Sequence, residues 1–97
     1  MSTYIALVNF TDQGMRSVKQ TTERAKALSA AATKLGIKVK EVYWTMGTYD
    51  AVLVADAPND EAITTLALSA GALGNIRTQT MRAYSAEEMS KIIAKMV

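Results

Sequence analysis

The side chains best suited to chemistry in this chain come together in Gly47-Thr48-Tyr49-Asp50, directly before an apolar stretch. Gly47 tolerates a positive φ and suits the first central position of a type II′ turn, so Gly47-Thr48 is predicted to be a hairpin tip. Tyr49 and Asp50 follow in a strand and therefore point to opposite faces of the sheet. Asp50 has two interpretations. It accepts hydrogen bonds from turn N–H groups, the commoner role of Asp beside a turn, or it is a polar anchor or proton acceptor in a pocket.

Cysteine and histidine are both absent from the chain. Their absence excludes disulfides, thiolate nucleophiles, zinc sites built on these residues and a Ser-His-Asp triad. A carboxylate-only site for Mg²⁺ or Ca²⁺ has no loop motif behind it, so no metal and no cofactor is expected. A general base would then be Asp50 or Glu41, with Arg77 or Arg82 stabilising developing negative charge.

The distribution of charge argues against nucleic acid as a partner. Eleven basic and nine acidic residues are interspersed and give a net charge of +2, whereas a nucleic-acid surface requires clustered basic residues. No apolar run approaches the roughly 18 residues needed to span a bilayer, and the N-terminus leads into a strand rather than a signal peptide. We therefore expect a cytoplasmic protein that does not contact a membrane.

Four strands and three helices are predicted to position these residues. Runs rich in β-branched and aromatic residues predict the strands, at residues 3–10, 37–46, 49–56 and 75–84. Apolar residues at the helical period predict the helices, at residues 15–35, 60–73 and 85–96. The apolar residues of the second strand change parity near Lys40-Glu41, which indicates either a β-bulge or apolar groups on both faces.

The last helix has the clearest start signal in the chain. Ser85 followed three residues later by Glu88 is a capping box, in which each side chain bonds the other's backbone N–H. The helical period predicts that this helix buries four apolar side chains, those of Met89, Ile92, Ile93 and Met96.

The order of elements indicates an α+β fold in a single domain, residues 1–97. A βαββαβ order gives a ferredoxin-like sheet of four antiparallel strands with two helices on one face, here with an extra C-terminal helix. The other face of the sheet would then be bare, with an apolar patch of several hundred Å². We expect a second copy of the sheet to cover it, and so predict a homo-oligomer, in the first place a dimer.

Several short motifs resemble those of the GYD domain family of small bacterial proteins, and the resemblance covers essentially the whole chain. They are Tyr4-Ile5-Ala6-Leu7, Thr11-Asp12-Gln13-Gly14, Gly47-x-Tyr49-Asp50, Ala57-Pro58-Asn59-Asp60 and Leu73-Gly74-Asn75-Ile76-Arg77-Thr78. Asn59 departs from the acidic residue expected there, which bears only on the helix cap. The resemblance implies a ferredoxin-like domain of the dimeric α/β-barrel type. It implies no reaction or catalytic residue, because a fold does not fix a function.

Three functions remain open from the sequence. The first is a small-molecule binding or sensing module that acts as a homo-oligomer. The second is a cofactor-independent isomerase, cyclase or monooxygenase with Asp50 as base, by analogy alone, and the third is a structural or interaction protein. The ligand-binding candidates are Trp44, Tyr49, Asp50, Arg77 and Arg82, with Tyr43 and Tyr84 as further aromatic walls.

Overall fold

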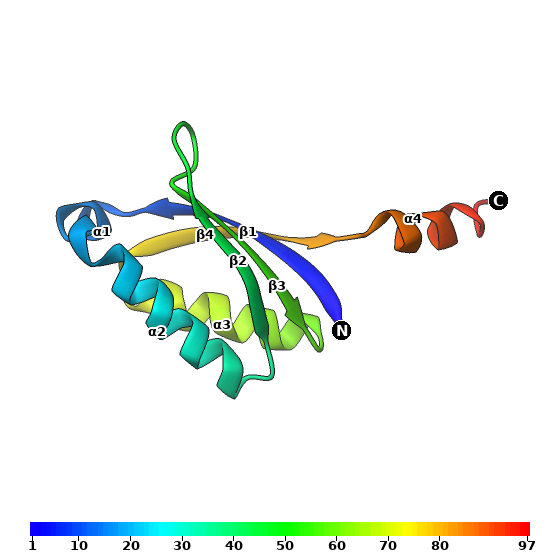
Figure 1. Cartoon of the computed structure of the whole chain (residues 1–97), viewed down its shortest axis with the longest axis horizontal. Coiled ribbons are helices and arrows are strands. Elements are labelled where there is room, and N and C mark those ends of the chain that lie inside the picture. The colour runs from blue at the N-terminus through cyan, green and yellow to red at the C-terminus, as the bar shows by residue number, and fades with distance from the viewer.

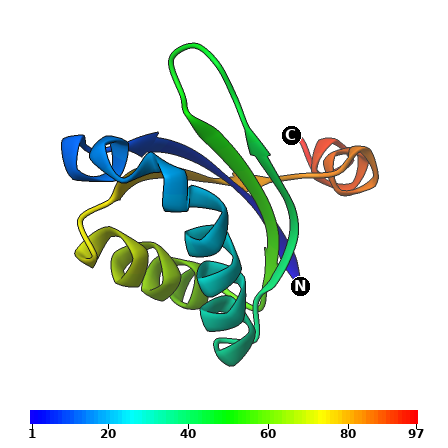
Figure 2. The ribbon, with the colours of Figure 1, turned by 60° about the vertical axis from the view of Figure 1, so that its left-hand side comes forward.

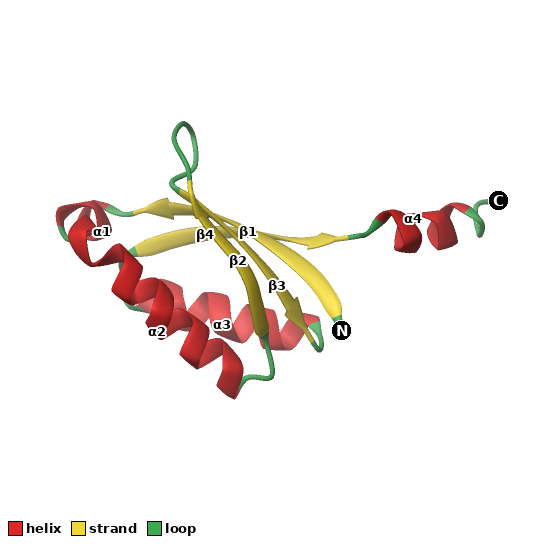
Figure 3. Cartoon of the chain, viewed as in Figure 1, coloured by secondary structure: helices red, strands yellow, loops and turns green.

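The computed structural model describes every residue from Met1 to Val97, and it has the ferredoxin-like arrangement expected from the order of elements. Four strands form one antiparallel sheet, and two long helices cover one of its faces (Figures 1 and 3). The elements are β1 (Ser2–Phe10), α1 (Asp12–Arg16), η1 (Val18–Gln20), α2 (Thr21–Lys34), β2 (Lys38–Trp44), β3 (Ala51–Ala57), α3 (Asp60–Ala72), β4 (Ile76–Ala83) and α4 (Ala86–Ile93).

The strand order is β2-β3-β1-β4, with β1 and β3 in the centre and all neighbours antiparallel. The central place of β1 follows from its sequence, which is apolar on both faces over most of its length. The register between β2 and β3 shifts between Val39 and Glu41, which confirms the predicted bulge. The bulge returns the apolar side chains of both halves of β2 to the helix side.

The core lies between the sheet and helices α2 and α3. Alternate residues of β1 and β3 face these helices and are buried, and many of them are alanines, which allow the helices to approach the sheet closely. The buried residues of this cluster are Tyr4, Ala6, Ala32, Ile37, Leu53, Ala55, Ala57, Ile63 and Leu66.

The predicted two-residue hairpin tip is wrong. Trp44 pairs with Ala51, and the Thr45 N–H donates to the Asp50 carbonyl at 2.9 Å, so the loop is longer than Gly47-Thr48. Gly47 does adopt the expected positive φ, 101°. The loop is longer because the Asp50 N–H bonds the Val8 carbonyl at 2.8 Å, which commits this residue to β1 rather than to a tight turn.

The predicted helix over residues 15–35 is broken in the structure. The chain forms α1, the 3₁₀ turn η1 and only then α2, which begins at Thr21. Ser17 separates α1 from η1, and its hydroxyl donates to the Gln13 carbonyl at 3.0 Å. A serine that bonds the carbonyl four residues earlier bends a helix, and the period of apolar residues does not report that bond.

The last helix differs most from expectation. Its capping box is present as predicted, but α4 contains no buried residue. All four apolar side chains predicted to be buried are exposed, from 43% for Ile92 to 74% for Met96. Figure 2 shows α4 beyond the end of β4, on the opposite side of the sheet from α2 and α3.

Candidate functional site

A polar cleft separates α3 from the edge strand β4 on the helix side of the sheet. Its volume is about 510 Å³. Strand β4 pairs with β1 and places alternate side chains toward the helices, but α3 does not close over them. The residues that line this α3–β4 cleft are Tyr4, Asp60, Ile63, Thr64, Ala67, Leu68, Thr78, Thr80 and Arg82.

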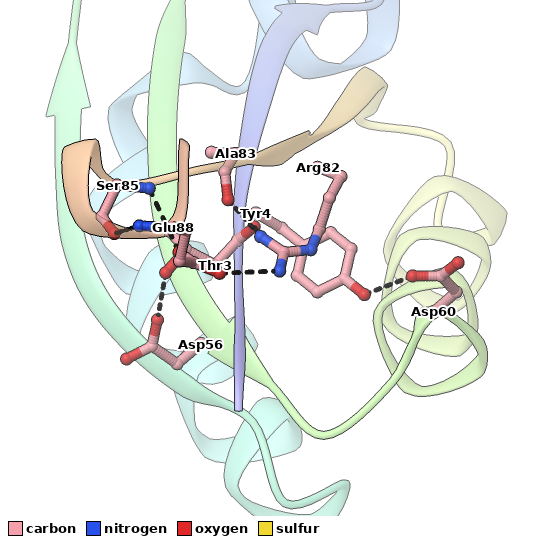
Figure 4. Close-up of polar contacts among 8 residues, drawn as sticks. All are labelled: Thr3, Tyr4, Asp56, Asp60, Arg82, Ala83, Ser85 and Glu88. Atoms are coloured by element: carbon pink, nitrogen blue, oxygen red, sulfur yellow. Dashed lines mark hydrogen bonds and ion pairs between the residues drawn. The ribbon is translucent and has the colours of Figure 1, made fainter. Parts of the chain in front are cut away.

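Tyr4 and Asp60 form the fixed polar pair of the cleft (Figure 4). The Tyr4 ring is buried in the core, and its hydroxyl donates to Oδ1 of Asp60. Asp60 is held in place because it is the first residue of α3, and Asn59 caps that helix by accepting the Ala62 N–H at 2.8 Å. The hydrogen bond to Asp60 raises the pKa of the Tyr4 hydroxyl, since the protonated phenol is the form that donates it.

Arg82 lies beside this pair and connects the cleft to α4 (Figure 4). Its guanidinium donates to the main-chain carbonyls of Thr3, at 3.3 Å, and of Ala83. It also forms an ion pair with Glu88 at 3.1 Å. The ring of Tyr84 lies 4.5 Å from the guanidinium, within the range of a cation–π contact. Arg82 is therefore fixed from several directions, and its charge is already paired.

Glu88 is the anchor of α4. Its carboxylate accepts the Ser85 N–H at 3.1 Å and the Arg82 guanidinium, and these contacts lower its pKa in that order of importance. A group whose pKa is lowered by folding contributes stability above its unfolded pKa, and this contribution is lost as the pH falls through the folded pKa. The anchor is therefore complete at neutral pH and is lost in acid.

We expect acidification from pH 6 to about pH 3 to release the first turn of α4, because Glu88 then gains a proton and loses Arg82. Amide hydrogen exchange of α4 measures this directly. The Glu88→Gln variant should show little pH dependence over the same range. Glu87, exposed and paired only with Lys91 at 3.6 Å, provides the matched control Glu87→Gln, which should behave as the wild type. Exchange of α4 that does not change with pH in the wild type would contradict the anchor.

The face of the sheet away from α2 and α3 carries a second feature, a continuous apolar patch. The pairing register places its members side by side across β3, β1 and β4. Met81 is 41% exposed, and the others are partly exposed. We call this patch the open-face cluster, and its members are Ile5, Leu7, Val52, Val54 and Met81.

The structure separates the residues proposed from the sequence. Of these, Arg82 lines the α3–β4 cleft. Tyr49 lies near the open face, where its hydroxyl donates to Gln79 at 3.2 Å. The carboxylate of Asp50 accepts the Phe10 N–H at 2.8 Å, so it ties the end of β1 to the start of β3. No contact brings Tyr49 or Asp50 to the cleft.

The other candidates are also apart. The Trp44 indole N–H donates to the Thr21 hydroxyl at 3.0 Å, which closes the start of α2 against β2. Arg77 is exposed at the end of β4, opposite Asn9 in the register. Glu41 accepts the Tyr43 hydroxyl at 2.9 Å on the edge strand β2. None of the four lines the cleft.

Sequence reasoning missed Tyr4, Asp60 and the threonines of the cleft. The available signal was the parity of β4, in which Thr78, Thr80 and Arg82 occupy one face of a strand. Helix-facing positions of a strand are normally apolar, so three polar residues there indicated a gap between strand and helix. No group of acidic side chains is arranged to hold a metal ion, and no helix is long and apolar enough to cross a bilayer.

These features define a small ferredoxin-like α+β module with one uncovered sheet face and one polar cleft. Comparison with known proteins then gives its family. The chain belongs to the GYD domain family, whose model matches residues 4–93.

Two similar proteins come from Thermus thermophilus. One is named "Glutamine synthetase and cystathionine beta-lyase binding protein" and is 27% identical over 90 residues, which is 92% of this chain and 95% of that protein. The other is TTHA0845, known from a crystal structure, at a TM-score of 0.57 and 26% identity, covering 89% of this chain and 96% of that one.

Proposed function

We propose that this GYD-domain protein is a protein-binding module that acts as a homodimer. The observation that carries the proposal is the amount of apolar surface the single chain leaves open. Only 12 of its 97 residues are buried, although the chain is long enough to build a larger core. The open-face cluster and the apolar side of α4 both remain without a partner.

A second copy of the chain is the partner best suited to this surface. Its own open face is apolar and of the same size, so two sheets related by a twofold axis can cover one another. Helix α4 lies on the same side of the sheet (Figure 2), and the second copy would cover it as well. Its apolar residues are spaced i, i+3, i+4 and i+7, the pattern of a helix seated in a groove.

The rim of the open face also suits an interface. Lys40 and Asp56 form an ion pair of 3.7 Å at one edge, and Thr3 donates to Asp56 at 2.9 Å. A polar rim around an apolar centre is the usual anatomy of a protein interface. A stable interface covers about 800 Å² on each partner, and the sheet together with α4 offers more than a sheet patch of a few hundred Å² alone.

The binding of other proteins is supported by the printed name of the Thermus relative, which refers to two enzymes. A dimer presents each of its surfaces twice, which raises the apparent affinity for oligomeric enzymes. We therefore propose enzymes of this kind, glutamine synthetase and cystathionine β-lyase of the same cell, as partners of the dimer.

Surface plasmon resonance against each of these two enzymes, purified and immobilised, tests the proposal. We expect an apparent Kd on the order of 1 μM for the wild type. The variant Met81→Lys, designed to break the dimer, should bind with a lower apparent affinity because avidity is lost. The variant Met15→Lys carries the same new charge on α1 and should bind as the wild type. No binding of either enzyme at about a hundred times that concentration would contradict the proposal.

A further inference from the structure

We propose that the α3–β4 cleft binds a small organic amine, with the ammonium group on Asp60 and the hydrocarbon part against Ile63 and Leu68. This inference goes beyond the protein-binding role. The cleft lies on the helix side of the sheet, whereas the surface assigned to the dimer is the opposite face. Its occupancy is therefore measurable whether or not the chain dimerises.

The first argument is the polar floor of the cleft. Thr78 and Thr80 lie opposite Val8 and Ala6 in the register, so they occupy helix-facing positions where the neighbouring strand contributes core residues. Valine has the shape of threonine without the hydroxyl, and packing alone would favour it. The hydroxyls of Thr64, Thr78 and Thr80 are absent from the hydrogen bonds within the chain and remain free to bind a ligand.

The second argument is the charge of the cleft. Its two ionic side chains differ, because Arg82 is paired with Glu88 whereas Asp60 has no basic partner. Tyr4 bonds Oδ1 of Asp60 and so holds the carboxylate in one orientation, which leaves Oδ2 available. A carboxylate with one occupied oxygen and no cation is complementary to an ammonium group, which also donates to threonine hydroxyls.

An anionic ligand fits less well. It would have to compete with Glu88 for the Arg82 guanidinium, whose remaining contacts go to the main-chain carbonyls of Thr3 and Ala83. It would also approach the unpaired charge of Asp60. Like charges repel strongly in a partly desolvated cleft, so the geometry favours a cation.

The third argument is the wall that faces the polar floor. Ile63 and Ala67 of α3 line it, and Leu68 is 69% exposed at its rim. A ligand with a short branched hydrocarbon chain would cover Leu68. The volume of about 510 Å³ is within the range of small-molecule sites. The structure therefore indicates an amine with an apolar end rather than a simple ammonium ion.

The test is an NMR titration of the ¹⁵N-labelled full chain at pH 7 with 3-methylbutylamine. Two probes share its carbon skeleton: leucine, which carries both charges, and 3-methylbutanoate, which carries only the negative one. We expect shifts at Thr78, Thr80 and the first turn of α3 with the amine, at a Kd on the order of 1 mM or lower. Leucine should bind no more tightly, and 3-methylbutanoate should not bind.

Asp60→Asn is the informative variant because its amide oxygen still accepts the Tyr4 hydroxyl, so the local fold is retained. Loss of the charge-assisted contact should raise the Kd for the amine about tenfold. Glu61→Gln, one residue further along α3 and outside the cleft lining, is the matched control and should leave the Kd unchanged. Thr80→Val, which keeps the shape of the side chain, should weaken binding several-fold.

Three results would overturn the proposal. They are 3-methylbutanoate binding as tightly as the amine, equal effects of Asp60→Asn and Glu61→Gln, and no localised shifts with the amine up to about 20 mM, well above the expected Kd. Sedimentation of the same samples separates this outcome from the fate of the dimer. A chain that dimerises without binding the amine contradicts only the cleft, and a monomer that binds it contradicts only the dimer.

Discussion

Replacing Met81 by lysine should convert the protein from a dimer to a monomer. Met81 is 41% exposed in the single chain and lies beside Ile5 in the open-face cluster. Placed in a twofold interface, two lysine ammonium groups would be buried near each other without partners. An unpaired buried charge costs several kcal/mol, so the dissociation constant of the dimer should rise by at least about a hundredfold.

Sedimentation velocity across a range of protein concentrations measures this change. The variant is expected to fold, because Met81 lies on the edge strand β4 and is outside the buried core. Circular dichroism of the monomer checks that expectation. The matched control is Met15→Lys on α1, where a methionine of similar exposure, 51%, lies away from the open face. A Met81→Lys protein that dimerises as tightly as the wild type would exclude the open face as the interface.

Replacing Gly14 by alanine should be among the most destabilising single changes in the chain. A Cβ built at Gly14 would lie 2.0 Å from the carbonyl oxygen of Asn75 and 2.9 Å from its carbon. Neither atom can move easily, because the Asn75 oxygen also accepts the Thr11 N–H at 3.1 Å. The backbone of α1 must therefore shift away from the start of β4. Overpacking of this kind costs about 1–3 kcal/mol or more, out of about 5–15 kcal/mol for a whole domain.

Urea denaturation of the two proteins measures the loss as a lower midpoint. Gly71→Ala is the matched control, since Gly71 lies within α3 and a Cβ there meets nothing within 4 Å. That change should raise stability by about 0.5–1 kcal/mol through helix propensity. Equal midpoints for Gly14→Ala and the wild type would show that α1 and β4 are not in close contact in solution. In the sequence, close approach of the backbone was one of two interpretations of Gly14, and the structure supports it.

Local sequence signals predicted the elements that depend on local interactions. The capping box of Ser85 and Glu88, the cap at Asn59 and the bulge between Val39 and Glu41 all appear where the sequence indicated them. Each involves residues a few positions apart or a simple alternation of apolar side chains. The hairpin loop was wrong because the conformation at Asp50 is decided by β1, about forty residues earlier in the chain.

The candidate site was predictable only in part for the same reason. The sequence selected Arg82 from its charge and strand parity, but its cleft also needs Tyr4 and Asp60, which are 56 residues apart. Their hydrogen bond exists because the register of β1 and the start of α3 bring the two side chains together. Chemical type alone instead favoured Tyr49 and Asp50, which are adjacent in sequence and are held at the end of the sheet.

The sequence by itself therefore determined the fold class, the order of elements, the family and the amphipathic character of α4. These properties follow from periodicity, caps and turn residues, which act over a few positions. Only the tertiary structure decided what each apolar or polar face contacts. A period of 3.6 residues specifies that Ile92 and Ile93 share a face, but whether that face is buried depends on packing between distant segments. In the single chain it is open, and β4 turns three polar side chains toward a gap beside α3.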